Sequence, residues 1–345
     1  MTIQHKWIEN FAHAFKASGV CADQWVVVAA ESESNPDLIA LSELALQRIG
    51  ARVTLVRVPS PAVKDHVPIR STGASTAFDA YPELMTALGN CSLLVDCSVE
   101  GLLHSRARQT FLEAGGRLLM ISNEHPEILE RCLPDVALRA RVDYSLKRLE
   151  AASTMQVRSR AGTDLTVNVD GAPCRGGAGF LTGDEKVAYW PAGLCLCFPL
   201  ANTVNGTVVF DVGDVNLTFK RYFESQVTLT IENDQVVEIA GEGLDARMLR
   251  SYYDAWNDPL ATAISHVGWG LNPRATWEAL NLYDKSQCNG TELRAVEGSF
   301  MISTGANEFA ERFTNCHFDI PMRNCSVMID EDPVLVDGRL QGRYS

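Results

Sequence analysis

Two histidines and one aspartate in the last quarter of the chain are of the types that bind a metal ion. His317 and Asp319 stand two residues apart in TNCHFDIPM, so a strand would place both side chains on one face. His266 lies in AISHVGWGL, where Gly268 and Gly270 indicate a backbone that bends or passes close to another group. Two imidazoles and one carboxylate are the ligand set of a mononuclear non-haem Fe(II) centre, which keeps open positions for substrate and O2.

Each of these residues also has an ordinary structural interpretation. The chain has seven histidines and 43 acidic residues in 345, so a His-x-acid pair is expected by chance, and a second pair occurs at His125 and Glu127. A buried histidine hydrogen-bonded to a carboxylate would explain His317 and Asp319 without a metal, and His266 could be a satisfied core residue. The residues alone leave both interpretations open.

Of the other five histidines, four have positions that indicate surface or structural roles. His5 and His13 fall in an amphipathic N-terminal helical pattern and His66 in a polar segment, so all three are expected at the surface. His125 directly precedes a proline, which is typical of a helix start. His104, in the segment LLHS, remains a candidate for chemistry.

Other catalytic motifs are weak or absent. Asp211 and Asp214 could bind a metal across a Val-Gly turn, although a β-turn explains the pair more simply. Cys195 and Cys197 could share one strand face, but two thiolates do not complete a zinc site. The sequence has no G-x-S-x-G, H-E-x-x-H or glycine-rich nucleotide-binding motif, so serine hydrolysis, classical zinc hydrolysis and nucleotide binding are unsupported.

Composition excludes several classes of partner. Hydrophobic residues make up 46% and charged residues 21%, which is typical of a folded protein. The net charge of −13 repels nucleic-acid phosphates and anionic lipids, so neither is an expected partner. The apolar runs are shorter than the roughly 20 residues of a membrane span, and the N-terminus does not resemble a signal peptide. We therefore expect a cytoplasmic protein whose ten cysteines are mostly reduced and buried.

The first 150 residues alternate strand-like and helical segments. Residues 37–49 have helical periodicity that ends at Gly50, and short apolar runs predict strands at 25–30, 52–58, 92–96 and 117–121. Strands that alternate with helices favour a parallel sheet covered on both faces. The sequence thus predicts an α/β domain over residues 1–150 with a mostly parallel sheet.

The pattern changes near residue 154. Apolar and polar residues alternate at 165–169 and at 227–231, and a returning run at 236–239 follows an Asn233-Asp234 turn, which predicts antiparallel, half-buried strands. A helical pattern follows at 244–256. We therefore predict an α+β domain rich in antiparallel strands over residues 151–345, and this domain would carry the metal ligands.

Several segments resemble the 2,5-dihydroxypyridine 5,6-dioxygenases of aerobic nicotinate breakdown. In chain order they are LLHS (102–105), YWPAG (189–193), GTVVFDVGDVNLTFK (206–220), ISHVGWGLNPRATW (264–277), STGAN (303–307) and CHFDIPMRNC (316–325). The resemblance covers most of the chain and is densest from about residue 185 to 330. These enzymes share a two-domain fold with the thermophilic-type leucyl aminopeptidases.

The resemblance implies that His266, His317 and Asp319 hold Fe(II). It further implies an extradiol-like cleavage by O2, without external reductant, of 2,5-dihydroxypyridine to N-formylmaleamate, or of a closely related hydroxylated N-heteroaromatic. Fe2+ beside one carboxylate keeps a net positive charge, which favours a deprotonated ring hydroxyl. The expected partners are a small aromatic substrate, O2 and further copies of the chain in a homo-oligomer.

Three more residues receive catalytic roles from the resemblance. His104 matches a histidine of the substrate pocket that would handle a ring proton or bind a substrate oxygen, the alternative being a structural residue at a helix start. Ser303 is a hydrogen-bonding candidate at the pocket wall. Tyr189 replaces a histidine of the family, and a phenol with a pKa near 10 is a poor base at neutral pH. Either proton transfer is arranged differently or the substrate is a related heteroaromatic.

Two other functions compete with the dioxygenase. A metallo-aminopeptidase of the related family would hold two metals and use the glutamate of a P-x-G-E stretch, which aligns with residues 191–194 here. Leu194 takes the place of that glutamate and cannot bind a metal. A catalytically silent two-domain protein that binds a small aromatic would consume no O2 and would not depend on His317.

Overall fold

A parallel sheet organises the N-terminal part of the chain. The computed structural model describes residues 2–62 and 75–345, so His66 lies outside the described residues. Five strands run in the order β2-β1-β3-β4-β8, and all neighbouring pairs are parallel. They are β1 (Trp25–Glu31), β2 (Arg52–Val58), β3 (Leu93–Asp96), β4 (Leu118–Ile121) and β8 (Val187–Trp190).

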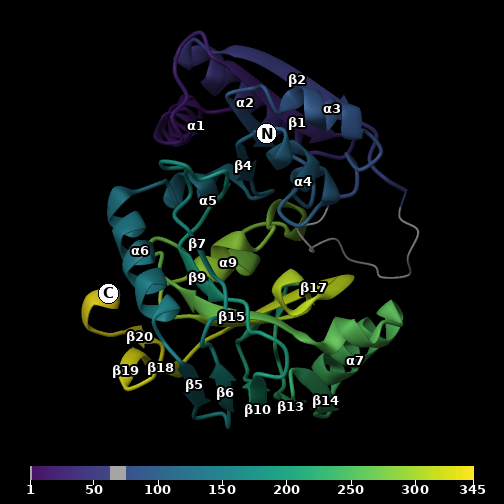
Figure 1. Cartoon of the computed structure of the whole chain (residues 1–345), viewed down its shortest axis with the longest axis vertical. Coiled ribbons are helices and arrows are strands. Elements are labelled where there is room, and N and C mark those ends of the chain that lie inside the picture. The colour runs from purple at the N-terminus through teal and green to yellow at the C-terminus, as the bar shows by residue number, and fades with distance from the viewer. Residues whose placement is uncertain (1, 63–74) are drawn as a thin grey trace.

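Helices cover both faces of this sheet, as the strand and helix alternation predicts (Figure 1). Val26 and Val28 of β1 pack in one apolar cluster with α1 and α2, while Val27 and Ala29 pack in another with α3 and α4. The helices of this part are α1 (His5–Ala17), α2 (Pro36–Ile49), α3 (Pro82–Leu88), α4 (Arg106–Glu113), α5 (Pro126–Arg131) and α6 (Val136–Glu150). The buried faces of β1 explain why its sequence is apolar without alternation.

Two antiparallel sheets form the C-terminal part. The larger has eight strands in the order β14-β13-β10-β6-β5-β18-β19-β20, and the smaller has five in the order β17-β16-β15-β9-β7. Their apolar faces share one core, which includes Val157 and Leu229 of the larger sheet and Trp269 and Phe318 of the smaller. The alternating burial of β6 and β13 agrees with their alternating sequence.

The strands of the larger sheet are β5 (Thr154–Ser159), β6 (Asp164–Asn168), β10 (Val204–Phe210), β13 (Val227–Glu232), β14 (Gln235–Ala240), β18 (Cys325–Ile329), β19 (Asp332–Val336) and β20 (Arg339–Leu340). The smaller sheet contains β7 (Cys174–Gly177), β9 (Leu194–Cys197), β15 (Ile264–Gly270), β16 (Phe300–Asn307) and β17 (Arg312–Met322). A short ribbon, β11 (Val215–Asn216) with β12 (Arg221–Tyr222), and the helices α7 (Leu244–Trp256), α8 (Ala279–Leu282) and α9 (Thr291–Ala295) complete this part.

The fold-class prediction is confirmed: a mostly parallel N-terminal sheet is followed by antiparallel C-terminal sheets. The helix predicted at 244–256 is α7, with the same bounds. The predicted boundary near residue 150 stays a prediction, and β8 crosses back to pair with β4 in the first sheet. All ten cysteines are free, and only Cys21 is exposed. None of the described helices is both long and apolar enough to cross a bilayer.

The smaller antiparallel sheet sets the positions of the candidate ligands. β16 pairs with β15 on one side and with β17 on the other, which places Ser303 opposite Asp319 and Gly305 opposite His317. The register of β15 with β16 shifts between Ile264 and Val267, at His266. The close approach indicated by the glycine of β15 is present as well, because a Cβ on Gly268 would lie 2.0 Å from the Cys195 carbonyl oxygen of β9.

Candidate metal centre

The structure brings His266, His317 and Asp319 together from two strands that do not pair with each other. The Nε2 atoms of the two histidines are 3.4 Å apart. Oδ1 of Asp319 lies 3.4 Å from the first of these nitrogens and 3.3 Å from the second. All three residues are buried, and we call them the ligand triad below.

The geometry of the ligand triad fits a bound cation. Three atoms spaced in this way lie about 1.9 Å from the centre of their triangle, near the roughly 2.0–2.2 Å of metal–nitrogen and metal–oxygen bonds in proteins. Oδ1 of Asp319 is buried and receives no hydrogen bond from the described residues. A buried carboxylate oxygen without a donor is costly unless a cation or another partner compensates it.

Burial and nearby charges keep Asp319 and His266 in the protonation states that bind metals. Burial would raise the pKa of Asp319, but His317 and Arg294 hold it well below its usual range, so the carboxylate is charged. Burial lowers the pKa of His266 to about 3, despite the opposing charge of Asp319, so its imidazole keeps a free lone pair at neutral pH. Deprotonated ligands of this kind are what a divalent ion requires.

Arg294 of α9 holds the second oxygen of the carboxylate. Its Nε donates to Oδ2 of Asp319 at 2.5 Å, which leaves Oδ1 facing the two histidines. The guanidinium therefore fixes the rotation of the carboxylate and balances its charge. The sequence analysis missed Arg294, because an arginine in an ordinary charged segment has no distinguishing spacing.

His104 reaches the ligand triad from the N-terminal part. Its ring centroid lies 4.8 Å from that of His317. The side chain contacts solvent, yet the surrounding protein and His317 hold the pKa of the imidazole well below its usual range. His104 does precede a helix, but Ser105 supplies the cap of α4 by accepting a hydrogen bond from the Arg108 backbone at 3.1 Å. The start of α4 therefore does not depend on the His104 imidazole.

Tyr189 and Ser303 also lie beside the triad. Ser303 is fully buried next to Asp319 across the β16–β17 pair, and its hydroxyl has no hydrogen-bond partner among the described residues. Tyr189 is the third residue of β8, and its ring packs over Gly177, where a Cβ would lie 2.7 Å from the phenol oxygen. Burial and the Asp319 charge raise the pKa of this phenol despite Arg294, so it remains a hydrogen-bond donor at neutral pH. The catalytic roles of these residues stay predictions.

Two phenylalanines that the sequence analysis missed form an aromatic wall next to the triad. The ring of Phe198 lies 5.3 Å from that of His266, and Phe309 packs edge-on against Phe198 at 5.4 Å. Both are half-buried, so each keeps an open surface. Arg175 lies over the ring of Phe309 at 5.3 Å. An apolar aromatic surface beside a polar centre suits a planar aromatic ligand.

The remaining candidates have structural roles. His125 caps α5 by accepting a hydrogen bond from the Glu127 backbone at 3.2 Å, as its position before a proline predicts. Asp211 and Asp214 bond to each other's backbone in a turn. Leu194 is buried in an apolar cluster with Ala295 and Met301, so no carboxylate stands at that position.

Comparisons with known proteins agree on one family. The family model NicX, described as 2,5-dihydroxypyridine 5,6-dioxygenase, matches residues 6–342. A curated relative from Pseudomonas putida KT2440, named 2,5-dihydroxypyridine 5,6-dioxygenase, is 35% identical over 335 residues, which cover 96% of this chain and 94% of the relative.

Solved structures support the same assignment. The structure of 2,5-dihydroxypyridine dioxygenase from P. putida KT2440 superposes with a TM-score of 0.92 at 33% identity, and the match covers 100% of both chains. Wild-type AmpT from Thermus thermophilus superposes with a TM-score of 0.65 at 17% identity, over 98% of this chain and 99% of that one, which shows a shared fold alone. From the family match and the curated relative together, the chain belongs to the 2,5-dihydroxypyridine 5,6-dioxygenase family.

Proposed function

We propose that this chain is an Fe(II)-dependent dioxygenase that opens the ring of 2,5-dihydroxypyridine, or of a closely related hydroxylated N-heteroaromatic, in an extradiol-like reaction. The expected product from 2,5-dihydroxypyridine is N-formylmaleamate. The observation that carries the proposal is the buried ligand triad with a free carboxylate oxygen. Family membership and the name of the P. putida relative support the substrate class.

His266, His317 and Asp319 would hold the iron through Nε2, Nε2 and Oδ1. Two imidazoles and one carboxylate would leave coordination positions open for substrate and O2 and, around Fe(II), would keep a net positive charge. Bound there, Fe(II) would supply the redox chemistry that O2 needs to react with a ring and the charge that favours a deprotonated hydroxyl.

The protein would orient the ring and manage its protons. Phe198 and Phe309 provide an apolar surface on which a planar ring can pack beside the triad. His104 has a lowered pKa and its ring lies 4.8 Å from that of His317, so its neutral imidazole would accept the proton of a ring hydroxyl. Tyr189 would donate a hydrogen bond to a substrate oxygen and, with its raised pKa, would not serve as the base.

Oxygen consumption separates the competing functions. The chain would be loaded anaerobically with Fe(II) and mixed with 2,5-dihydroxypyridine in an oxygen electrode. The proposal predicts O2 uptake that matches substrate loss one to one, without added reductant. Ligand binding with no O2 uptake would favour a silent binding protein. Release of amines from dipeptides would favour a peptidase, which the apolar surroundings of Leu194 oppose.

Replacing His104 tests the proton-transfer role. His104→Gln is expected to lower kcat about 100-fold, since general acid–base groups typically contribute 10²–10⁴-fold, while iron content stays at the wild-type level. Turnover is measured by O2 uptake and iron by metal analysis. His13→Gln is the control, because the one hydrogen bond that the His13 side chain of α1 makes among the described residues joins it to the Pro134 carbonyl oxygen at 3.1 Å. Equal turnover in both variants would remove His104 from the mechanism.

Removing one hydroxyl tests the role of Tyr189. Tyr189→Phe is expected to lower kcat/KM about tenfold, which is the loss of one hydrogen bond to a charged oxygen. The apolar packing over Gly177 is kept in this variant, so stability and iron content should not change. A loss above about 10³-fold would instead assign the phenol to proton transfer. Steady-state kinetics with a known iron occupancy distinguish these results.

A further inference from the structure

A buried carboxylate of the N-terminal part caps a helix of the C-terminal part. Glu124 follows β4 and is completely buried. It accepts hydrogen bonds from four successive backbone N–H groups at the start of α9. The distances are 2.9 Å from Asn289, 2.9 Å from Gly290, 2.7 Å from Thr291 and 3.4 Å from Glu292. These are the orphan donors of a helix start, and an anion is their best partner.

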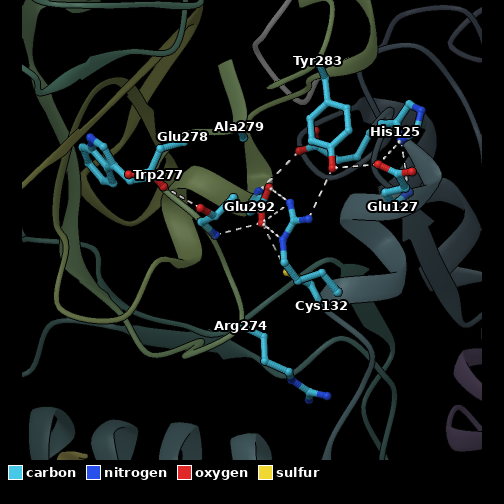
Figure 2. Close-up of polar contacts among 12 residues, drawn as sticks. His125, Glu127, Cys132, Arg274, Trp277, Glu278, Ala279, Tyr283 and Glu292 are labelled. Carbon is cyan, nitrogen blue, oxygen red and sulfur yellow. Dashed lines mark hydrogen bonds and ion pairs between the residues drawn. The ribbon is translucent and has the colours of Figure 1, made fainter. Parts of the chain in front are cut away.

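A second contact from the same segment fixes the same helical turn. Arg131, the last residue of α5, forms two parallel hydrogen bonds to Glu292, with Nε–Oε1 at 2.9 Å and Nη2–Oε2 at 3.0 Å. Glu292 also accepts from the Thr276 backbone at 2.9 Å, and Tyr283 accepts from Arg131 at 3.3 Å. Figure 2 shows Glu292, Cys132 and Tyr283 grouped around these contacts.

The capped helix ends at the ligand triad. α9 has five residues, and a helix of one turn is not stable without contacts at its ends. Arg294 lies within this turn and donates to Oδ2 of Asp319. The start of α9 packs closely against Leu217, since a Cβ on Gly290 would lie 2.6 Å from Leu217 Cδ2. The position of the guanidinium therefore depends on the contacts that hold the start of α9.

We propose that Glu124 is a positioning residue of the metal centre, which acts through α9 and Arg294 on the Asp319 carboxylate. The inference rests on the proposed function in that Asp319 is taken as a metal ligand. With the helix start held, Arg294 occupies Oδ2 and leaves Oδ1 to the cation. When the cap is lost, α9 shifts or frays, the guanidinium leaves Oδ2, and the carboxylate is free to rotate away from the triad.

Divalent-ion binding by the full chain tests this inference. Glu124→Gln keeps the size of the side chain but turns an amide N–H₂ toward backbone donors. Calorimetric titration with Mn(II) should show affinity about tenfold weaker, as is typical when a group supporting a metal ligand is lost. In an Arg294→Gln background, the same change at Glu124 should alter the affinity less than about twofold, because the path to Asp319 is already broken.

Arg274→Ala is the matched control. Arg274 also joins the two parts of the chain, by bonds of 3.0 Å to the Leu133 carbonyl and to Asp135, but within the described residues its side chain forms no hydrogen bond or ion pair with α9. Figure 2 places it away from the cluster around Glu292. It should lower the unfolding midpoint without changing Mn(II) affinity. Equal losses of affinity in Glu124→Gln and Arg274→Ala, or additive effects of the Glu124 and Arg294 changes, would overturn the inference.

A second measurement keeps the inference separate from the proposed function. If the unchanged chain bound no divalent ion, the proposed function would fail. Hydrogen exchange would then test the positioning role of Glu124. Protection of the backbone amides of residues 290–295 should fall in Glu124→Gln and not in Arg274→Ala. Unchanged exchange in this segment would refute the positioning role whether or not a metal binds.

Discussion

Asp319→Ala is expected to lose most of its bound iron and to reduce ring cleavage by more than about 10³-fold. The substitution removes the only carboxylate of the ligand triad and leaves two imidazoles. Changes that merely disturb the support of a ligand cost about 10–100-fold in metal affinity, so loss of the ligand itself should exceed that range. Iron per chain and O2 uptake with 2,5-dihydroxypyridine are the two measurements.

Misfolding must be separated from ligand loss in this experiment. Asp319 is buried, and its removal leaves Arg294 without its carboxylate, which by itself destabilises the protein. Asp214→Asn is the control, since Asp214 is equally buried and accepts from the Asp211 and Arg323 backbones but lies outside the triad. Wild-type iron content in Asp319→Ala, or an equal loss in the control, would count against the metal assignment.

The sequence predicts the fold class because local periodicity reports which faces of an element are buried. The strand at 25–30 is apolar throughout since both faces of β1 are covered, and 244–256 is helical because its apolar positions recur on one face. Neither pattern carries information about strand order. β8 is four residues long and follows a stretch of the antiparallel part, so its return to β4 depends on long-range pairing.

The ligand triad could be identified from the sequence because histidine is rare in this chain and because a strand places His317 and Asp319 on one face. Arg294, Phe198 and Phe309 were not, because arginine and phenylalanine occur throughout the chain and their contributions arise only in the folded protein. The same holds for Glu124, whose partners lie about 165 residues later in the chain.

The N-terminal sheet contributes to the centre from one edge. His104 lies in the loop that follows β3, Glu124 in the loop that follows β4, and Tyr189 at the end of β8. Because these strands are parallel, their carboxyl ends meet at the same edge of the sheet. Ligands of open parallel sheets bind beyond that edge. Here the edge places these side chains beside a proposed metal centre whose candidate ligands all come from the smaller antiparallel sheet, so the complete site would need both parts of the chain.

Gly305→Ala is expected to lower the free energy of unfolding by about 3–5 kcal/mol. Gly305 has φ of +107°, which disfavours any residue with a Cβ. A Cβ there would also lie 2.0 Å from the Cys316 carbonyl oxygen and 3.2 Å from the His317 Cα. Both are backbone atoms, so β17 must move, and the triad moves with it. Thermal unfolding and Mn(II) titration should therefore show a lower midpoint together with weaker binding.

Gly171→Ala separates the two causes of that loss. Gly171 also has positive φ, at +67°, but a Cβ there would have no atom of the described residues within 4 Å. Gly171→Ala should therefore lower the free energy of unfolding only through backbone strain, by about 1 kcal/mol, and leave Mn(II) affinity unchanged. If Gly305→Ala were no worse than Gly171→Ala in midpoint and in affinity, β17 would not be held as tightly against β16 as the register of Gly305 with His317 requires. The spacing of the ligand triad would then have to be maintained by α9, whose Arg294 holds the Asp319 carboxylate.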